Sequence, residues 1–294
     1  MSGRILLGPP DQGSIVNRGI LTPSATRALL DHLGHRPRPQ LGQNFLVDGN
    51  IVRKSLELAH VAPGESVVEI GPGLGTLTSA LLAAGAEVFA IERDAVLYAH
   101  LQETLLPASG GRLHLLEGDA VNVPLGPLPA DATSFKIVAN LPYAISSPWM
   151  EALLAGRLPE RMVLMLQLEA AQRYGSAPGS KSFGAITVFL QAAFRLGRGH
   201  RVGRGCFFPV PEVDSTLLNL ERLESPYAFS AAGRGLVRTL FQQRRKQVVP
   251  LLRKLAPAIA DPWLDILSQA GVRPDTRAEN VPVPVWIELD RLVR

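Results

Sequence analysis

The chain has 294 residues, of which 46% are hydrophobic and 19% are charged, a balance that is ordinary for a soluble globular protein. The length predicts one large domain and one smaller domain. No apolar run approaches the roughly 20 residues of a membrane span, and the N-terminus lacks the pattern of a secretory signal. The lone Cys206 excludes an internal disulfide. We therefore expect a cytoplasmic protein, without a structural metal because no Cys and His residues have metal-ligand spacing.

The net charge of +4 is distributed unevenly along the chain. All charged residues between Glu169 and Glu212, and again between Glu224 and Asp261, are basic. Surfaces that face phosphates have this character. The alternative interpretation is a solvated face whose arginines serve solubility, although such faces usually mix both signs. We therefore predict RNA contacts from Lys181, Arg195, Arg198, Arg201, Arg204, Arg244, Arg245 and Lys246.

The first 22 residues carry Gly, Pro, Asn and Ser without hydrophobic periodicity, so we expect a loose N-terminal leader. Thr22, Pro23 and Ser24 are suited to begin a short helix over residues 25–33. The Pro-rich stretch 35–40 cannot be helical. An amphipathic helix is predicted over residues 49–59.

Five apolar runs predict strands at residues 66–70, 87–91, 112–116, 135–139 and 162–166. Helical patterns lie between most of them, and this alternation predicts an α/β fold with a Rossmann-like, mostly parallel sheet covered on both faces. Two further stretches, 194–202 and 216–223, would add a terminal antiparallel hairpin. Beyond residue 223 we expect only helices, over 229–255 and 263–270. The sequence therefore predicts a sheet domain at residues 23–223 and a small helical, RNA-binding domain at 224–294.

A glycine-rich loop, Glu69-Ile70-Gly71-Pro72-Gly73-Leu74-Gly75, follows the first strand and opens a helix predicted over residues 76–84. Glycine lets a ligand approach the backbone closely, so candidate cofactor-binding residues are Glu69, Gly71, Gly73 and Gly75. The spacing G-x-G-x-G differs from the G-x-G-x-x-G of a pyrophosphate loop, and there is no P-loop lysine. A dinucleotide is therefore the weaker choice.

Polar residues also stand at the ends of the next three strands, namely Glu92, Asp119 and Asn140. Carboxyl ends of parallel strands meet at one edge, where open α/β sheets bind ligands. Glu92 suits the two hydroxyls of a ribose, and Asp119 can accept a hydrogen bond from an adenine amino group. S-Adenosylmethionine has both groups, and we predict it as the cofactor. Each acidic residue taken alone could instead cap a helix.

Asn140-Leu141-Pro142-Tyr143 directly follows the strand predicted over residues 135–139. The lone pair of an amino group on a base is delocalised into the ring, so it must be drawn out before it attacks a sulfonium methyl. The Asn140 side-chain oxygen and the Leu141 carbonyl, which precedes a proline, offer two acceptors for such an amine. Tyr143 can stack on a base that has left its stack. The pattern predicts methylation of a base; the alternative is a polar turn after a buried strand.

In chain order, Gln43-Asn44-Phe45-Leu46, the glycine loop, Glu92, Gly118-Asp119 and Asn140-Leu141-Pro142-Tyr143 resemble the motifs of the ribosomal RNA adenine dimethyltransferase family. The resemblance runs from about residue 25 to the end of the chain. It continues through Ser180-Lys181-Ser182-Phe183-Gly184, Phe207-Phe208-Pro209-Val210-Pro211-Glu212-Val213-Asp214-Ser215, Gln243-Arg244-Arg245-Lys246 and Arg277-Ala278-Glu279-Asn280. The last two motifs are similar to the bacterial small-subunit branch rather than to the antibiotic-resistance enzymes that modify large-subunit RNA.

The resemblance implies dimethylation of N6 of two adjacent adenines in a hairpin loop near the 3′ end of 16S ribosomal RNA, late in small-subunit assembly. S-Adenosylhomocysteine would be the product. The implied cofactor contacts are Asn44, Leu46, Gly71, Glu92, Asp119 and Asn140. The adenine would be addressed by Asn140, the Leu141 carbonyl, Pro142 and Tyr143, with Phe207 or Phe208 as a second stacking surface. Leu168 departs from the family, which often has lysine there, and the residues before Thr22 have no counterpart.

Other functions fit the sequence less well. A cytosine-C5 methyltransferase needs a nucleophilic cysteine, typically after proline, but Cys206 follows Gly205 and is expected to be a packing residue. A large-subunit adenine methyltransferase remains an alternative. So does an RNA-binding assembly or transcription factor that keeps the fold without turnover, although intact Glu92, Asp119 and Asn140 argue against that loss. We expect a monomer whose partner is 16S ribosomal RNA in the small subunit or its precursor.

Overall fold

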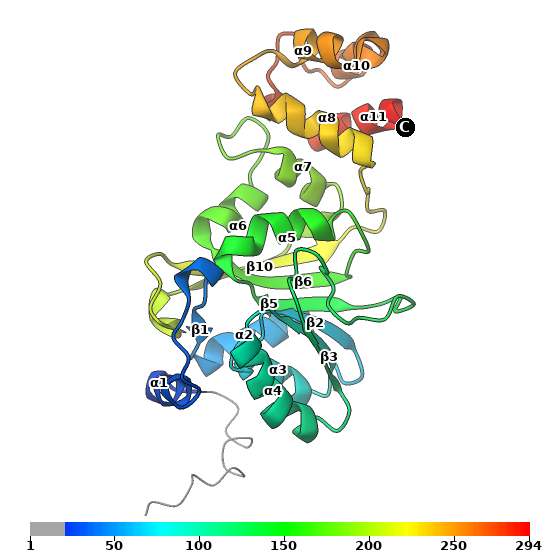
Figure 1. Ribbon diagram of the computed structural model, residues 1–294. Helices are drawn as coiled ribbons and strands as arrows, with labels where there is room; N and C mark the ends of the chain where they lie inside the picture. Colours follow the sequence, from blue (N-terminus) through cyan, green and yellow to red (C-terminus); the bar gives the residue numbers. More distant parts are fainter. Residues whose placement is uncertain (1–20) are drawn as a thin grey trace, which may run out of the picture.

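A central eight-stranded sheet organises the chain, of which the computed structural model describes residues 21–294 (Figure 1). Five parallel strands adjoin in the order β4-β3-β2-β5-β6. Their bounds are β2 Ser66–Ile70, β3 Glu87–Glu92, β4 Leu113–Glu117, β5 Lys136–Asn140 and β6 Arg161–Gln167. Each lies within one residue of its predicted range at both ends, and the predicted α/β class is confirmed. Among the described residues, no helix is long and apolar enough to cross a membrane.

The alternation of buried side chains along the strands assigns a helical layer to each face of the sheet. Val67, Val88 and Val138 share a core with α2 (Gly49–Ala59) and α3 (Thr76–Ala83), whereas their neighbours Val68 and Ile137 pack with α5 (Ser146–Leu153) and α7 (Ala185–Gln191). Such strands, buried on both faces, are typical of parallel sheets. Helices α4 (Ala95–Ala108) and α6 (Leu168–Tyr174) also accompany the sheet.

The antiparallel edge differs from the predicted hairpin in one respect. β10 (Ser215–Arg222) pairs with β6, as an added antiparallel strand should, but the stretch expected over 194–202 forms two strands, β7 (Phe194–Leu196) and β8 (His200–Val202), which both pair with β10. The interruption is a turn whose glycines touch β10. A Cβ would lie 2.6 Å from Asn219 Nδ2 if added at Gly197, and 2.7 Å from the Leu217 carbonyl oxygen if added at Gly199.

The N-terminal segment folds over the carboxyl edge of the sheet. Helix α1 (Pro23–His32) begins two residues before its predicted start because the Thr22 side chain caps it and Pro23 fits the first turn. After a 3-10 turn (Pro39–Leu41), β1 (Phe45–Leu46) pairs with β9 (Phe207–Phe208), which joins two segments far apart in sequence. The predicted leader, residues 1 to 22, lies almost entirely outside the described residues.

Four helices follow the last strand: α8 (Ala231–Gln242), α9 (Val248–Leu255), α10 (Pro257–Gln269) and α11 (Val283–Val293). They lie beyond α7, at the end of the molecule opposite α3 and α4 (Figure 1). The prediction of one helix over 229–255 was wrong, because the chain is interrupted between α8 and α9. There Gln247 forms a β-bridge with Arg277, and Val248 N donates to the Thr276 carbonyl. Helix α10 begins six residues before its predicted start, and α11 was missed.

The helical region and the sheet share one hydrophobic core. Phe189 of α7 meets Phe229 with ring centroids 5.0 Å apart, and Phe183 meets Phe241 of α8 at 6.1 Å. The predicted domain boundary near residue 224 lies just after the end of β10. That the chain divides there into two domains remains a prediction.

The buried carboxylate of Asp290 joins α11 to the start of α8. It accepts hydrogen bonds from Tyr227 Oη (2.7 Å), Ser230 N (3.1 Å) and Ser230 Oγ (2.6 Å), and from Arg294 Nε (3.0 Å). Burial would by itself raise the pKa of Asp290, but these donors outweigh it and lower the pKa. Asp290 is therefore a fixed, charged anchor of the helical region.

Two glycines of α8 provide a matched test of that anchor. A Cβ at Gly233 would lie 1.7 Å from Asp290 Oδ1, whereas nothing lies within 4 Å of a Cβ at Gly235. Gly233→Ala should lower the free energy of unfolding by roughly 1 to 3 kcal/mol, since it displaces a hydrogen-bonded buried charge. Gly235→Ala should raise it by up to about 1 kcal/mol through helix propensity. Urea unfolding measures both, and equal effects of the two variants would contradict the anchor.

Candidate functional site

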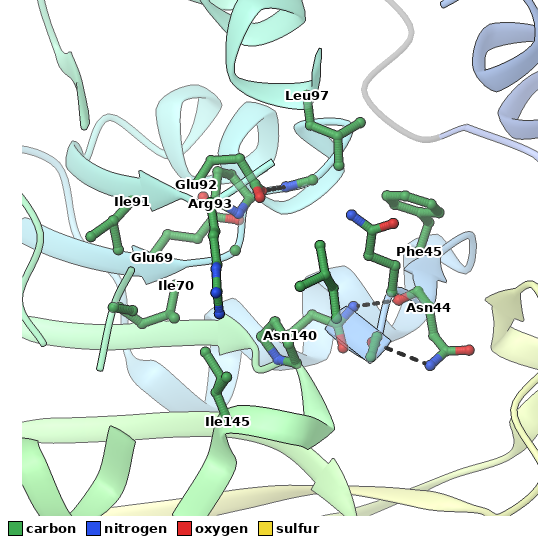
Figure 2. A pocket seen from close by; sticks show the side chains of 18 of the residues that line it. Asn44, Phe45, Glu69, Ile70, Ile91, Glu92, Arg93, Leu97, Asn140 and Ile145 are labelled. Carbon is green, nitrogen blue, oxygen red and sulfur yellow. Dashed lines mark hydrogen bonds between the residues drawn. The ribbon is translucent and has the colours of Figure 1, made fainter. Parts of the chain in front are cut away.

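A cavity opens at the carboxyl edge of the parallel strands, between that edge and the segment around β1 (Figure 2). Eight of the nine residues predicted to bind a cofactor line it: Asn44, Leu46, Glu69, Gly71, Gly73, Glu92, Asp119 and Asn140. The ninth, Gly75, does not. It caps α3 with a φ of 81°, and a Cβ there would lie 2.4 Å from Leu105 Cδ1, so its absent side chain serves the packing of α4.

The glycine loop is held close to its neighbours by positive backbone angles. Gly71 has a φ of 66° and Gly73 a φ of 60°. A Cβ would lie 3.0 Å from Pro142 Cγ at Gly71, and 3.2 Å from the Phe45 ring at Gly73. Larger residues would therefore be both strained and crowded, which leaves the loop backbone as one wall of the cavity.

Glu92 at the end of β3 organises the loop. Its Oε2 accepts from Gly73 N at 3.0 Å and its Oε1 from Asp94 N at 2.9 Å. Burial raises the pKa of Glu92, although these backbone donors act in the opposite direction. Each carboxylate oxygen has a further lone pair, so Glu92 can still accept from two neighbouring hydroxyls in the cavity.

Glu69 is the more deeply buried acid, with 1% of its surface exposed. Thr78 Oγ1 donates to its Oε2 at 2.7 Å, and no described residue donates to Oε1. Burial raises the pKa of Glu69 to about 8 despite the Thr78 hydrogen bond, and the charge of Glu92 adds to the rise. The cavity therefore contains a carboxyl group that is protonated at neutral pH and that a cation would ionise.

Asp119 both caps a turn and lines the cavity. Its Oδ1 accepts from Val121 N at 2.9 Å, as a turn cap does, while Oδ2 lies 3.1 Å from Arg93 Nη1. Its side chain is 27% exposed and faces the cavity. The capping hydrogen bond fixes the carboxylate at the cavity wall, where it can accept from a polar ligand.

Asn140 is oriented by the N-terminal segment. Its Nδ2 donates to the Asn44 carbonyl oxygen at 2.8 Å, which directs Oδ1 away from that segment (Figure 2). No residue among 21–294 donates to the carbonyl oxygen of Leu141. The two acceptors predicted for an incoming amine are therefore available. Gly42 lets the N-terminal segment pack closely against the turn after β5, since a Cβ there would lie 2.9 Å from Tyr143 N.

A second hollow lies on the other side of Asn44. It is lined by Tyr143, Gln167, Val210 and neighbouring residues, and it shares Gly42, Gln43 and Asn44 with the first cavity. The Tyr143 hydroxyl is 2.5 Å from Ser215 Oγ, and burial raises its pKa. The two hollows thus meet at one short wall beside Asn140.

The two phenylalanines predicted as a second stacking surface differ in exposure. Phe207 is 1% exposed and packs in the core beside the sheet, so it is the less accessible of the two candidates for a stacking surface. Phe208 is half-buried, and the Arg27 guanidinium lies 5.3 Å from its ring centroid. Neither lines the second hollow.

Sequence reasoning missed the residues that hold the wall between the hollows. Gln43 Oε1 accepts from Arg38 N at 2.8 Å and lies 3.1 Å from His35 Nε2, while Gln43 Nε2 donates to Asp94 Oδ2 at 3.1 Å. Asp94 also caps α4. Its position just after a predicted strand is typical of a helix cap, but nothing in the sequence indicates its partners some 50 residues earlier.

The basic stretches lack acidic residues in sequence but not in space. Arg195 pairs with Glu221 and Arg201 with Asp214 at 2.8 Å, while Arg244 pairs with Glu279 and donates to the Lys181 carbonyl at 2.8 Å. Among residues 21–294, no ion pair forms at Arg198, Arg204, Arg245 or Lys246. No group of three or more possible metal ligands occurs in the same described range.

Comparisons of sequence agree with this geometry. A family model described as "Ribosomal RNA adenine dimethylase" matches residues 34–291. The "Ribosomal RNA small subunit methyltransferase A" of Opitutus terrae is 61% identical over 267 residues, covering 90% of this chain and 96% of the relative. The protein of the same name from Moorella thermoacetica is 38% identical, with coverage of 94% and 99%.

Solved structures share the fold. A dimethyladenosine transferase from Plasmodium falciparum superimposes with a TM-score of 0.69 at 24% identity, covering 83% of this chain and 95% of that one. The 23S rRNA methyltransferase ErmE has a TM-score of 0.60 at 27% identity, with coverage of 84% and 98%. The Rossmann-like methyltransferase architecture is thereby confirmed.

The burial of Glu69 gives a testable pH dependence. Because its pKa is about 8 in the folded protein and near 4.5 when unfolded, the folded state holds a proton that the unfolded chain releases. The free energy of unfolding should therefore fall as pH rises from 5 to 8, by up to about 1.4 kcal/mol per pH unit from this group. Glu69→Gln should flatten that slope in urea unfolding without ligand. The 55% exposed Glu57, as Glu57→Gln, is the control, and identical slopes in all three proteins would refute the assignment.

Proposed function

Because the chain belongs to the ribosomal RNA adenine dimethylase family, we propose that it dimethylates N6 of two adjacent adenines in a hairpin loop near the 3′ end of 16S ribosomal RNA. It is an S-adenosylmethionine-dependent rRNA adenine dimethyltransferase, and S-adenosylhomocysteine is its product. The single observation that carries the proposal is the anchored Asn140, whose Nδ2 is held by Asn44 so that Oδ1 and the Leu141 carbonyl are left to accept from an amine.

The lining of the first cavity fits the cofactor. A Cβ at Gly71 or Gly73 would be crowded and its backbone strained by a positive φ, and with glycine there the backbone itself can contact a ligand. Glu92 is suited to the ribose hydroxyls, Asp119 to the adenine amino group, and the buried Glu69 to the cationic methionyl end. S-Adenosylmethionine supplies an electrophilic methyl on a positively charged sulfur. These residue roles are proposals that rest on geometry and charge.

In the proposed mechanism, the residues of β5 and its following turn activate the amine by position. Asn140 Oδ1 and the Leu141 carbonyl accept from N6, which turns its lone pair out of the adenine ring. The nitrogen becomes acidic only as it gains charge, so its proton can leave to water without a general base. Positioning and fixed dipoles then provide most of the barrier reduction.

Tyr143 is proposed to hold the extruded adenine by stacking. Its hydroxyl is fixed by Ser215, which is fully buried on β10, so the ring is a rigid wall of the second hollow. A rigid aromatic face loses little conformational freedom when a base stacks on it. With Phe207 buried, the opposite face of the base would be covered by exposed residues of the hollow such as Val210.

The small subunit is the proposed substrate because the relatives at 61% and 38% identity carry that name, while ErmE, a 23S enzyme, is 27% identical. The proposed setting is the cytoplasm, with the protein acting as a monomer on the subunit or its precursor. RNA contacts are proposed for the basic residues Lys181, Arg195, Arg198, Arg201, Arg204, Arg244, Arg245 and Lys246. Leu168 occupies the position of the family's common lysine and begins α6, so any contact of that lysine is absent here.

The decisive experiment is methyl incorporation from labelled S-adenosylmethionine into unmethylated small subunits, followed by mapping of the modified bases. Asn140→Ala should lower the single-turnover rate by roughly 10² to 10³-fold, as loss of one preorganised polar group does, with little change in subunit affinity. Binding of cofactor and subunits by the wild-type protein without methyl transfer would instead favour an assembly factor. Labelled 23S RNA would favour the large-subunit alternative.

Tyr143 variants separate stacking from hydroxyl chemistry. Tyr143→Phe keeps the ring and should be mild, although it removes the partner of Ser215. Tyr143→Ala should lose roughly 1 to 3 kcal/mol of stacking, by analogy with single-strand binders. Single-turnover rates at saturating cofactor and RNA provide the comparison. Equal losses in the two variants would mean that the hydroxyl, rather than the ring, is required.

A further inference from the structure

A basic groove lies outside both hollows, between helix α2 and the turn that joins β7 to β8. We call it the α2 groove and define its charged lining as Arg53, Lys54 and Glu57 of α2 with Arg198 and Arg201 of the turn and β8. The α2 residues recur at helical spacing on its outward face, whereas Ile51, Val52 and Ser55 are turned to the core.

The turn is shaped to present Arg198. Gly197 and Gly199 on either side of it press against β10, where a Cβ would lie 2.6 Å from Asn219 Nδ2 and 2.7 Å from the Leu217 carbonyl oxygen, respectively. Larger residues would lift the turn off the sheet. Arg198 itself is exposed and makes no hydrogen bond or ion pair within residues 21–294, so its side chain has no evident structural duty.

The charges of the α2 groove are only partly compensated. Lys54 pairs with Glu57 at 3.0 Å and Arg201 with Asp214 at 2.8 Å. In the described part of the chain Arg53 reaches only the neutral Asn50, and Arg198 reaches no carboxylate. Exposed ion pairs contribute little stability, so the two paired cations can exchange partners readily. The groove thus offers four cations to an anionic ligand, two of them without a carboxylate partner.

The α2 groove lies near the second hollow, because Arg201 pairs with Asp214 at 2.8 Å and the neighbouring Ser215 lies 2.5 Å from the Tyr143 hydroxyl. Asp48, which caps α2, accepts from Cys206 Sγ at 3.4 Å, and Cys206 adjoins β9, which pairs with β1 beside the cofactor cavity. From Asn50 to Glu57 the outward face of α2 runs about 10 Å, given the helical rise of 1.5 Å per residue.

We propose that the α2 groove binds the phosphate backbone of the RNA stem next to the methylated loop. The inference rests on the proposed function and adds a contact on α2, separate from the C-terminal basic residues. Double-stranded RNA is recognised mainly through its shape and its phosphates. An RNA occupant is favoured over an acidic protein because the groove carries four cations and its Arg201 pairs with Asp214, which adjoins the Ser215 that holds Tyr143 in the hollow proposed for the target base. Binding there would align the loop with Asn140 before any base is read.

The test compares Arg53→Gln combined with Arg198→Gln against a matched pair, Arg273→Gln combined with Arg291→Gln, whose side chains are 84% and 59% exposed in the helical region. Affinity for unmethylated small subunits is measured across a salt series. The groove variant should bind more weakly, and its slope of log affinity against log salt should shrink by about one per arginine. The matched pair should retain the wild-type slope. Cofactor affinity should be unchanged in both.

A second measurement locates the RNA directly. In a Cys206→Ser background, Glu57→Cys provides a single thiol on α2 for a tethered hydroxyl-radical probe, and Asp265→Cys provides a distant control. Strand cleavage in a stem adjoining the methylated loop is expected from position 57 alone. Wild-type affinity and salt slope in the groove variant, or cleavage elsewhere, would overturn the proposal even if methyl transfer is normal. Absence of methyl transfer by the wild-type protein would refute the proposed function instead.

Discussion

The parallel register of β2, β3, β4 and β5 is the constraint on which the site depends. Ile70 pairs with Ile91, Glu92 with Glu117, and the central β2 with β5, so the strands end at one edge. Each strand carries a polar group at or just beyond its carboxyl end, and the edge therefore gathers Glu69, Glu92, Asp119 and Asn140 around a single cavity. A slip of one residue in any strand would turn its side chains to the opposite face and disperse the set.

The N-terminal segment divides that edge into two compartments. The β1-β9 pairing and the Gln43 hydrogen bond to Asp94 hold residues 42–44 between the cofactor cavity and the hollow beside Tyr143. Asn140 stands at the junction, with its amide nitrogen held by the Asn44 carbonyl. The same segment thus lines both compartments and orients Asn140, which lines the first of them.

Charge within the site and charge around it follow different physics. Inside the cavity, burial raises the pKa of Glu69 and Glu92, since a low-dielectric environment penalises a carboxylate, and a cationic ligand would relieve that penalty. On the surface, Arg198 and Arg201 remain hydrated, and their attraction for phosphate is screened by salt. Cofactor affinity should therefore depend more on pH, and RNA affinity more on ionic strength.

The sequence by itself determined the sheet, the glycine loop and the polar strand ends, because hydrophobic periodicity and glycine are local signals. Three features depend on partners that are distant in sequence, so the sequence could not determine them. Gly75 packs against Leu105, and Phe207 is buried in the core beside the sheet. Helices α8 and α9 are separate because Val248 bonds to Thr276. Tertiary structure also decided which arginines face carboxylates. Ion pairs form between side chains that are near in space, and a stretch without acids in the sequence says nothing about Glu221, Asp214 or Glu279 brought to it by folding.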